Sequence, residues 1–434
     1  MKRAIVVALI LGLATCAFAV EIEPTGTFYF WYWYNMSDYP DWYALHPYAG
    51  DSAFYIERVY AGFNFATDWK LSGQFLFDVG QDLDKDYALT TTTDEDGNVT
   101  GATLTSTVLK APYHAYLKHA YLQYPIFSEY LNIRGGSIPS TFPNEVTKAW
   151  GYRVVADGPV SGFAKWESTA DLGLDLFGGY KKWVLYHFTF TNGEGYTKPE
   201  ANAGKALSLM LQTYPANMVK VLENLNLALY ARSNSVNPDY QDNTALLAAL
   251  IGWKYDFDFG LGLNLGFTGG LQRHNQARGY APDYKALGKA LKDEYDTSYN
   301  YDDSVDGLLM SGFGEISYSL KGVNVDYGKV ALFGRYDVFD PNTRNDTGTY
   351  DKYVRDYKNE ADFDPTLARA ITGAQDEKAY LIMGVSYAYK KFRVCVDYQT
   401  TSYSEAVDSD DVDADLDTQR PADTYIFTNF EFSF

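Results

Sequence analysis

The last twelve residues of the chain, with the sequence DTYIFTNFEFSF, restrict its fold more than any other stretch. Counting back from the terminus in steps of two separates mostly apolar side chains from polar ones. The first series is Phe434, Phe432, Phe430, Thr428 and Ile426, and the second is Ser433, Glu431 and Asn429. A period of two indicates a β-strand with one apolar face. Soluble domains rarely end this way, because their termini are usually exposed and frayed.

In a transmembrane β-barrel, by contrast, the last strand closes the cylinder and one of its faces meets lipid. The ending of this chain resembles the C-terminal signature of outer-membrane barrels, an aromatic last residue with apolar residues at alternate positions, which the barrel-assembly machinery reads. That resemblance implies that Phe430, Phe432 and Phe434 form an assembly signal. The alternative is the edge strand of a soluble sheet, and the other segments of the chain distinguish the two.

The chain begins with its only long apolar run, MKRAIVVALILGLATCAFA. Lys2 and Arg3 precede an apolar segment at residues 4–13, and an A-x-A site follows at residues 17–19. This pattern predicts a secretory signal peptide at residues 1–19, too short for a transmembrane helix. Residues 20–434 would then form a single barrel domain. Lipoprotein processing at Cys16 is the alternative, but Thr15 is a poor residue before a lipidated cysteine.

The composition favours a barrel over a soluble multidomain protein. Aromatic residues make up 17% of the chain although its mean hydropathy is only -0.29, so apolar side chains are abundant without long apolar runs. Removal of the signal leaves Cys395 as the only cysteine, which excludes an intrachain disulfide. With no spanning helix left, only a closed barrel would satisfy the backbone in lipid. The net charge of -20 argues against nucleic-acid binding, which needs a basic surface.

Strand-like segments with alternating polarity recur along the whole chain. In one of them, Asp171 and Asp175 alternate with Leu172, Leu174 and Leu176. Segments of about ten residues suit a tilted strand that crosses a bilayer, with leucines facing lipid and polar residues facing a lumen. The sixteen segments are residues 25–34, 52–66, 69–79, 115–124, 130–137, 169–179, 183–191, 205–214, 222–231, 244–255, 260–271, 308–320, 327–338, 379–389, 392–400 and 423–434.

The connections between these segments test the barrel independently, because bacterial barrels alternate short periplasmic turns with long outer loops. Short turns follow the even-numbered strands, as at residues 67–68, 180–182 and 390–391, and long loops lie between them. Residues 160–166 look like a strand but would make the count odd, so we assign them to the third loop. We therefore predict an all-β fold, a transmembrane antiparallel β-barrel of about sixteen strands with both termini on the periplasmic side.

Several stretches resemble the phosphate-selective porin O and P family of sixteen-stranded outer-membrane channels. They include FYIERVYAGFNFATDWKLSGQFLFD, KHAYLQYPI with LNIRGGSIPSTFPNEV, GKVALFGRYDVFDPN and YLIMGVSYAYKKFRVCVDYQ, and together such patches cover most of the chain. The resemblance implies a homotrimer of water-filled channels in the outer membrane, in contact with lipid and lipopolysaccharide. It also implies that the third loop folds into the pore, starting near Pro139, Phe142 and Glu145.

The charges expected in the lumen depart from that family, in which phosphate selection uses a ladder of arginines with lysines at the constriction. Here basic and acidic residues are mixed, so we expect passive diffusion of ions and small polar solutes with a weak cation preference. The alternative is that these charges pair along the wall. The candidate pore-lining residues are Arg58, Lys70, Asp78, Arg134, Glu145, Lys148, Arg153, Asp171, Asp175, Arg335, Asp337, Arg393, Asp397 and Glu431.

Acidic stretches at residues 81–86, 94–97 and 408–417 have the alternating carboxylates that suit Ca²⁺, but none has the glycine and glutamate spacing of an EF-hand. We expect solvated outer loops that bridge lipopolysaccharide through divalent ions, with Ca²⁺ binding as the alternative and no other cofactor. The tyrosine-rich residues 295–303 leave a carbohydrate-specific porin or an adhesin open. An enzymatic barrel is not expected, because no segment carries a recognisable nucleophile motif.

Overall fold

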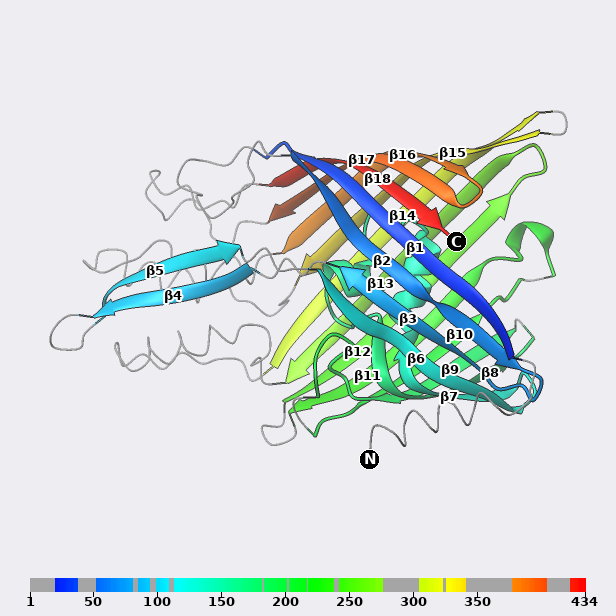
Figure 1. Cartoon of the computed structure of the whole chain (residues 1–434), viewed down its shortest axis with the longest axis horizontal. Helices are drawn as coiled ribbons and strands as arrows, with labels where there is room; N and C mark the ends of the chain where they lie inside the picture. Colours follow the sequence, from blue (N-terminus) through cyan, green and yellow to red (C-terminus); the bar gives the residue numbers. More distant parts are fainter. Residues whose placement is uncertain are drawn as a thin grey trace.

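The protein is a closed barrel of sixteen antiparallel strands (Figure 1), which confirms the predicted fold class and strand count. The computed structural model describes residues 20–37, 52–80, 85–93, 99–108, 113–181, 183–200, 203–216, 218–237, 242–275, 304–322, 325–340, 377–403 and 422–434. The predicted signal peptide at residues 1–19 lies outside these ranges. No helix among the described residues is long and apolar enough to span a bilayer.

Each barrel strand pairs with its neighbours in sequence, and β1 pairs with β18 to close the cylinder. The strands are β1 (Val20–Asn35), β2 (Ser52–Thr67), β3 (Ser72–Gly80), β6 (His114–Phe127), β7 (Leu131–Pro139), β8 (Ala170–Tyr180), β9 (Val184–Thr191), β10 (Ala206–Thr213), β11 (Asn226–Asn237), β12 (Asp242–Asp256), β13 (Leu261–Asn275), β14 (Ser304–Gly322), β15 (Val325–Asp340), β16 (Lys378–Tyr389), β17 (Phe392–Tyr403) and β18 (Asp423–Ser433).

A separate two-stranded hairpin interrupts this order between β3 and β6. It consists of β4 (Lys85–Thr93) and β5 (Val99–Val108), and it projects beyond the barrel (Figure 1). The sequence predicts a long loop here, between the strand segments at residues 69–79 and 115–124. Its threonine-rich segments carry no apolar face, so polarity alternation gave no sign of strands there.

The seam between β1 and β18 matches the interpretation of the last twelve residues. Phe430 lies opposite Phe30 and Phe432 lies opposite Phe28. Phe432 and Phe434 are exposed on the outer face, whereas Asn429 is buried on the inner face. The backbone pairing continues to the final residue, since the amide of Phe434 donates to the carbonyl of Gly26 at 3.0 Å.

The outer surface of the barrel carries a band of exposed apolar side chains. On β8 and β10 these are the leucines at alternate positions, Leu172, Leu174, Leu176, Leu207, Leu209 and Leu211. Buried Asp171 and Asp175 alternate with the first three, as the sequence predicts. An apolar exterior around a closed barrel is the arrangement of a transmembrane protein of the outer-membrane type.

Two β-bulges change which residues reach the lumen. In β2, Tyr29 is opposite Arg58 while Phe30 is opposite Ile56, so Glu57 is the extra residue. In β6, Leu76 is opposite His119 while Phe77 is opposite Leu117, so Lys118 is extra. A bulge sends two consecutive side chains toward one face of the sheet. In the sequence FYIERVY, Glu57 stands directly before Arg58 and interrupts the alternation of polarity, and this bulge accounts for the interruption.

The connections alternate between short turns and long loops over most of the barrel, with one exception. Only residues 238–241 separate β11 from β12, whereas residues 214–225 separate β10 from β11 and include a 3₁₀ turn, η2 (Lys220–Leu222). The predicted strict alternation of lengths therefore fails at the middle of the chain. The β10–β11 connection is long although it lies at the end of the barrel that carries the short turns. The order of the strands is not changed by this difference in length.

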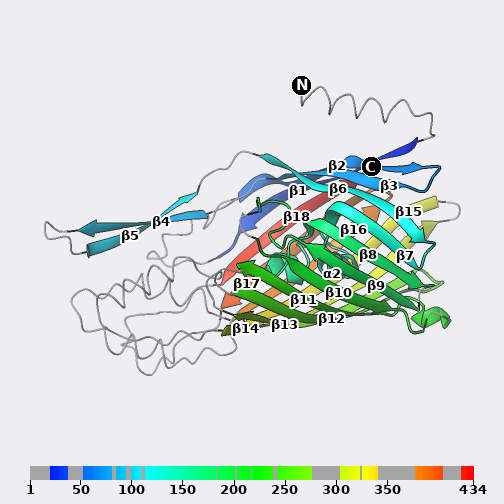
Figure 2. The same ribbon diagram turned by 90° about the horizontal axis from the view of Figure 1, so that it is seen from below.

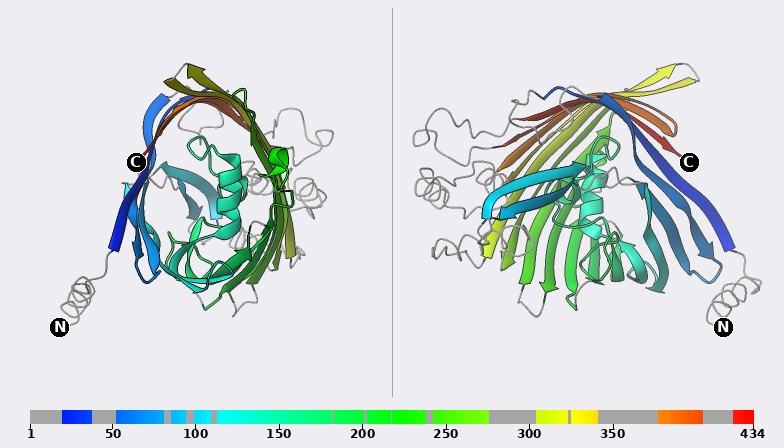
Figure 3. Two further views of the ribbon diagram at one scale, coloured as in Figure 1. Left: turned by 90° about the vertical axis from the view of Figure 1, so that its right-hand side faces the viewer. Right: turned by 60° about the vertical axis from the view of Figure 1, so that its left-hand side comes forward.

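The third loop, residues 140–169, folds into the barrel and contains helix α2 (Thr141–Trp150) and a π-helical turn, η1 (Pro159–Phe163). Figure 3 shows α2 inside the ring of strands, and Figure 2 shows it from the side. The helix is capped by Gly151, which adopts φ 78° and donates its backbone N–H to the carbonyl of Thr147. The assignment of residues 160–166 to this loop is confirmed, since η1 is not a strand.

Candidate functional site

The apolar side of the third loop is packed against the inner wall of the barrel. Phe142, Trp150 and Tyr152 are almost completely buried. Phe142 stacks on Tyr230 of β11 at 4.9 Å between ring centroids, and Tyr152 stacks on Phe333 of β15 at 4.1 Å. Burial of a large side chain contributes about 1.5–3 kcal/mol. This packing covers the wall from β10 to β17, so that part of the lumen surface is not open to solutes.

Polar side chains of the wall hold the backbone carbonyls of the third loop. The indole nitrogen of Trp31 donates to the carbonyl of Val154 at 2.6 Å, and a guanidinium nitrogen of Arg393 donates to that of Gly151 at 2.6 Å. Arg335 donates to the carbonyl of Asp157 at 2.6 Å. These bonds come from β1, β17 and β15, so the second half of the loop is fixed along the wall.

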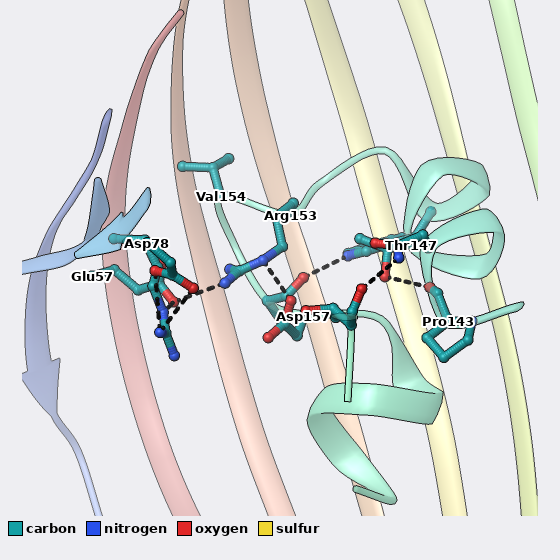
Figure 4. Close-up of polar contacts among 12 residues, drawn as sticks. Glu57, Asp78, Pro143, Thr147, Arg153, Val154 and Asp157 are labelled. Carbon is teal, nitrogen blue, oxygen red and sulfur yellow. Dashed lines mark hydrogen bonds and ion pairs between the residues drawn. The ribbon is translucent and has the colours of Figure 1, made fainter. Parts of the chain in front are cut away.

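Charged residues of the third loop meet charged residues of β2 and β3 in a group that we call the constriction cluster: Glu57, Arg58, Asp78, Arg153 and Asp157. Figure 4 labels all of these residues except Arg58. A terminal nitrogen of Arg153 lies 3.1 Å from Glu57, and its Nε lies 2.5 Å from Asp157. Arg58 lies 3.3 Å from Asp78. Burial alone would lower the pKa of Arg153, but Asp157 and Glu57 hold it well above its ordinary value.

A second charged group lies on β7, β8 and β9. Arg134 is 3.8 Å from Asp175, and the Nδ1 of His187 is 3.0 Å from the same carboxylate. The guanidinium of Arg134 also lies over the rings of Tyr121 and Phe177, at 4.9 and 4.6 Å. A planar guanidinium between two rings keeps its charge while its orientation is fixed.

On helix α2, Glu145 and Lys148 form an ion pair at 3.6 Å. Glu145 also accepts a hydrogen bond from Gln212 of β10 at 3.1 Å. The side chain of Lys148 is 74% exposed, although the helix lies inside the barrel. Lys148 is therefore an exposed cation on a helix that lies inside the ring of strands.

Several of the predicted pore-lining residues are enclosed rather than open to the lumen. Arg335 and Asp337 form a buried ion pair at 2.8 Å beneath the third loop. Asp397 is buried and accepts hydrogen bonds from Gln399 and Asn429. The third loop covers this side of the barrel, and a strand pattern cannot reveal that a loop lies over it.

Three further candidates also have structural contacts. Asp171 is buried, and its carboxylate accepts the backbone amide of Gly193 at 2.7 Å. Arg393 and Glu431 lie 3.6 Å apart on the inner faces of β17 and β18. Many of the candidate charges therefore pair with an opposite charge along the barrel wall, which is the alternative to an open position in the pore.

The expected lumen position of Lys70 is corrected by the structure. Lys70 lies in the turn between β2 and β3, is exposed, and adopts φ 67°. Its amide donates to the carbonyl of Thr67, which closes the turn. The polarity alternation of residues 69–79 continues into the turn, so the pattern placed the start of the strand too early.

Sequence reasoning missed Glu57, Lys118, Asp157 and Tyr196 as lumen residues. Glu57 and Lys118 are the bulge residues, and a bulge shifts the phase of the alternation. Asp157 and Tyr196 belong to loops, where no periodicity applies. The break in alternation at Glu57 is the one signal that could have identified one of them.

The predicted acidic and tyrosine-rich outer segments at residues 94–97, 408–417 and 295–303 lie outside the described residues, as do residues 81–84. Within the described part of the chain, no three His, Cys, Asp or Glu residues are grouped so that they could hold a metal ion.

No protein-family model and no curated protein matches the chain. Among solved structures, it is similar to an anion-selective porin from Comamonas acidovorans, with a TM-score of 0.51 and 10% identity over 96% of this chain and 100% of that one. The outer membrane channel DcaP of Acinetobacter baumannii has a TM-score of 0.49 and 10% identity, over 96% and 98%. OprB of Pseudomonas putida has a TM-score of 0.49 and 10% identity, over 95% of this chain and 94% of that one.

The likeness to the Comamonas protein establishes the fold, which is that of an outer-membrane porin barrel. The resemblance to the phosphate-selective porin O and P family is not matched by a family model and stays a prediction.

Proposed function

We propose that the protein is an outer-membrane porin, a water-filled channel for passive diffusion of ions and small polar solutes with a weak cation preference. The observation that carries this proposal is the position of the third loop. Its apolar side packs on the wall from β10 to β17, and its charged residues face β2 and β3. Such an arrangement narrows the lumen while leaving a charged passage.

The charge pattern supports cation preference over anion selection. Arg58, Arg134 and Arg153 each have a carboxylate within 4 Å, so their positive charges are largely compensated. A net charge of -20 for the whole chain also concentrates cations near the channel mouths. An anion channel would need basic side chains whose charge is not neutralised by such neighbours.

Current through planar bilayers containing the purified protein tests this function. We expect stepwise conductance, and a reversal potential in a salt gradient with the sign of cation permeation. Absence of steps would remove the channel, and a reversal potential of the opposite sign would leave a channel that prefers anions.

A carbohydrate-specific channel is the second candidate, and the aromatic side chains near the constriction cluster favour it. The rings of Tyr29 and Tyr60 meet edge to face at 5.9 Å, and those of Tyr116 and Tyr196 do so at 6.4 Å. Aromatic faces can stack on sugar rings. Saturable block of the ion current by maltodextrins, but not by added salt, would favour this function over general diffusion.

We also propose the membrane context that the sequence implies. Residues 1–19 would direct export, Phe430, Phe432 and Phe434 would be recognised by the barrel-assembly machinery, and the mature chain would form a homotrimer. The acidic outer loops would bridge lipopolysaccharide through divalent ions such as Ca²⁺. Native mass spectrometry of the detergent-purified protein, with and without a chelator, measures both the trimer and the retained lipopolysaccharide.

A further inference from the structure

The loop between β9 and β10 begins at residue 192, and its described residues 192–200 reach across the inside of the barrel. The hydroxyl of Tyr196 donates to Asp78 of β3 at 2.5 Å. The ring of Tyr196 also meets Tyr116 of β6 and lies 5.4 Å from the ammonium of Lys118. In the barrel order, β8, β7 and β6 separate β9 from β3. This loop therefore covers the inner face of those strands instead of extending away from the barrel.

Local backbone geometry directs the loop inward. Gly193 and Gly195 adopt φ values of 96° and 84°, which other residues rarely tolerate. The amide of Gly193 is held by Asp171, and its carbonyl accepts a bond from Asn234 of β11. A Cβ at position 195 would lie 2.7 Å from the side chain of Ser168, in the third loop. The base of the loop is thus hydrogen-bonded to β8 and β11, and it lies close to the third loop.

The two inward loops are connected through the wall of the barrel. The hydroxyl of Tyr60 lies 3.1 Å from the ammonium of Lys118 and 3.4 Å from a guanidinium nitrogen of Arg153. Lys118 also lies over the ring of Tyr60, at 4.5 Å. A chain of contacts therefore runs from Arg153 of the third loop, by way of Tyr60 and Lys118, to Tyr196.

The positions of the two loops around the barrel are complementary. Helix α2 lies against β13, where Asn264 donates to the carbonyl of Ala149. Strand β3, which carries Asp78, is half-way round the closed sheet from β13. The inner surfaces on opposite sides of the lumen are thus each covered by a loop.

We propose that residues 192–200 form a second constriction segment, in which Tyr196, held by Asp78 and Lys118, narrows the channel opposite α2 and sets its size limit. This inference rests on the proposed channel function. Burial raises the pKa of the Tyr196 hydroxyl, and the neighbouring Asp78 carboxylate raises it further, so the hydroxyl stays protonated and can donate.

Substitution of Tyr196 tests the proposal through the size of solutes that pass. For Tyr196→Ala, we expect higher single-channel conductance and a shift of the size limit to larger neutral sugars in a liposome-swelling assay. For Tyr196→Phe, which keeps the ring and loses the bond to Asp78, we expect the wild-type size limit with more frequent fluctuations of the open current. Tyr336→Ala is the matched control, because it removes an exposed tyrosine from the outer face of β15 and leaves Tyr196 and its partners untouched.

The outcomes separate this inference from the channel function itself. If wild-type protein gives no conductance steps, the channel function fails. If wild-type protein conducts but Tyr196→Ala has the same conductance and size limit, the second constriction segment is refuted. A heat-dependent mobility shift confirms that each variant is folded, and Tyr196→Leu replaces Tyr196→Ala with the same two outcomes if the latter does not fold.

Discussion

At the scale of single residues, Arg153 joins the third loop to the barrel wall. It contacts Glu57, Asp157 and the hydroxyl of Tyr60, and its guanidinium lies 5.5 Å from the centre of the Tyr29 ring. Lysine could not replace it, because one ammonium cannot present the separate nitrogens that contact Glu57 and Asp157. Loss of Arg153 would leave Asp157 without this cation and Glu57 with only Arg58, at 3.5 Å.

We therefore expect Arg153→Gln to shift the reversal potential further toward cation permeation and to loosen the third loop. A double-mutant cycle with Glu57→Gln measures the pair directly, and residues in such contact couple by about 0.5–3 kcal/mol. Unfolding temperatures of the four proteins give the coupling. Additive effects would contradict the ion pair described here.

At the scale of elements, α2 and β18 have different roles. Helix α2 is held by apolar packing, with Phe142 and Trp150 buried against the inner wall. Strand β18 is held by backbone pairing to β1 and β17, and Phe432 is exposed on its outer face. Substitutions in α2 should therefore change the conductance of the channel, whereas changes in β18 should change the amount of barrel that folds.

For Phe142→Ala, we expect a cost of about 3–5 kcal/mol in packing of the third loop, because a buried ring is replaced by a cavity. The barrel strands do not depend on this contact, so the protein should still show a heat-dependent mobility shift. Single-channel records should show a noisier and larger open current. Phe188→Ala, an exposed ring on β9, is the control and should leave the current unchanged.

Deletion of Phe434 removes the terminal backbone pairs with Gly26, at 3.0 and 3.3 Å, and an outward-facing ring. We expect less folded barrel in the outer membrane but normal conductance from the molecules that insert. Ser433→Ala, which removes only an inward hydroxyl beside Thr27, serves as the control. Normal barrel levels after the deletion would argue against an assembly role for the C-terminal aromatic residues.

At the scale of the whole molecule, an apolar exterior and a hydrogen-bonded closed sheet explain why so much of the fold is predictable. Strands such as β8 meet lipid outside and carry polar groups inside, so alternation such as Asp171 to Leu176 marks them directly. All sixteen predicted segments correspond to barrel strands. The closed sheet satisfies its own backbone, which predicts a strand-rich circular dichroism spectrum and slower unfolding than in a soluble sheet.

The residues of the candidate site are less predictable from the sequence than the strands, because bulges, loops and long-range contacts decide where they lie. Glu57 and Lys118 lie at bulges, which depend on pairing with other strands. Arg335 and Asp397 follow the lumen phase of their strands, yet the third loop covers them. Tyr196 meets Asp78 across a separation of 118 residues, and no local pattern encodes that contact.

A heat-dependent mobility shift tests the closed barrel as a whole. We expect the unheated protein to migrate as a compact species in detergent gels and the heated protein to migrate as an extended chain, because the closed sheet resists detergent until its strands separate. Identical migration of the two samples, together with a helical circular dichroism spectrum, would contradict the barrel.

In the channel that we propose, solutes pass through the lumen beside the charged face of the third loop, and chemical modification of Lys148→Cys in planar bilayers tests this path. The side chain at this position is exposed, and the buried Cys395 of the wild-type chain provides an unreactive control. We predict that a sulfonate-bearing thiol reagent lowers the single-channel conductance and shifts the reversal potential toward cations, while a trimethylammonium-bearing reagent shifts it the other way. If mass spectrometry shows complete modification but conductance and reversal potential are unchanged, solutes do not pass beside position 148 of the third loop.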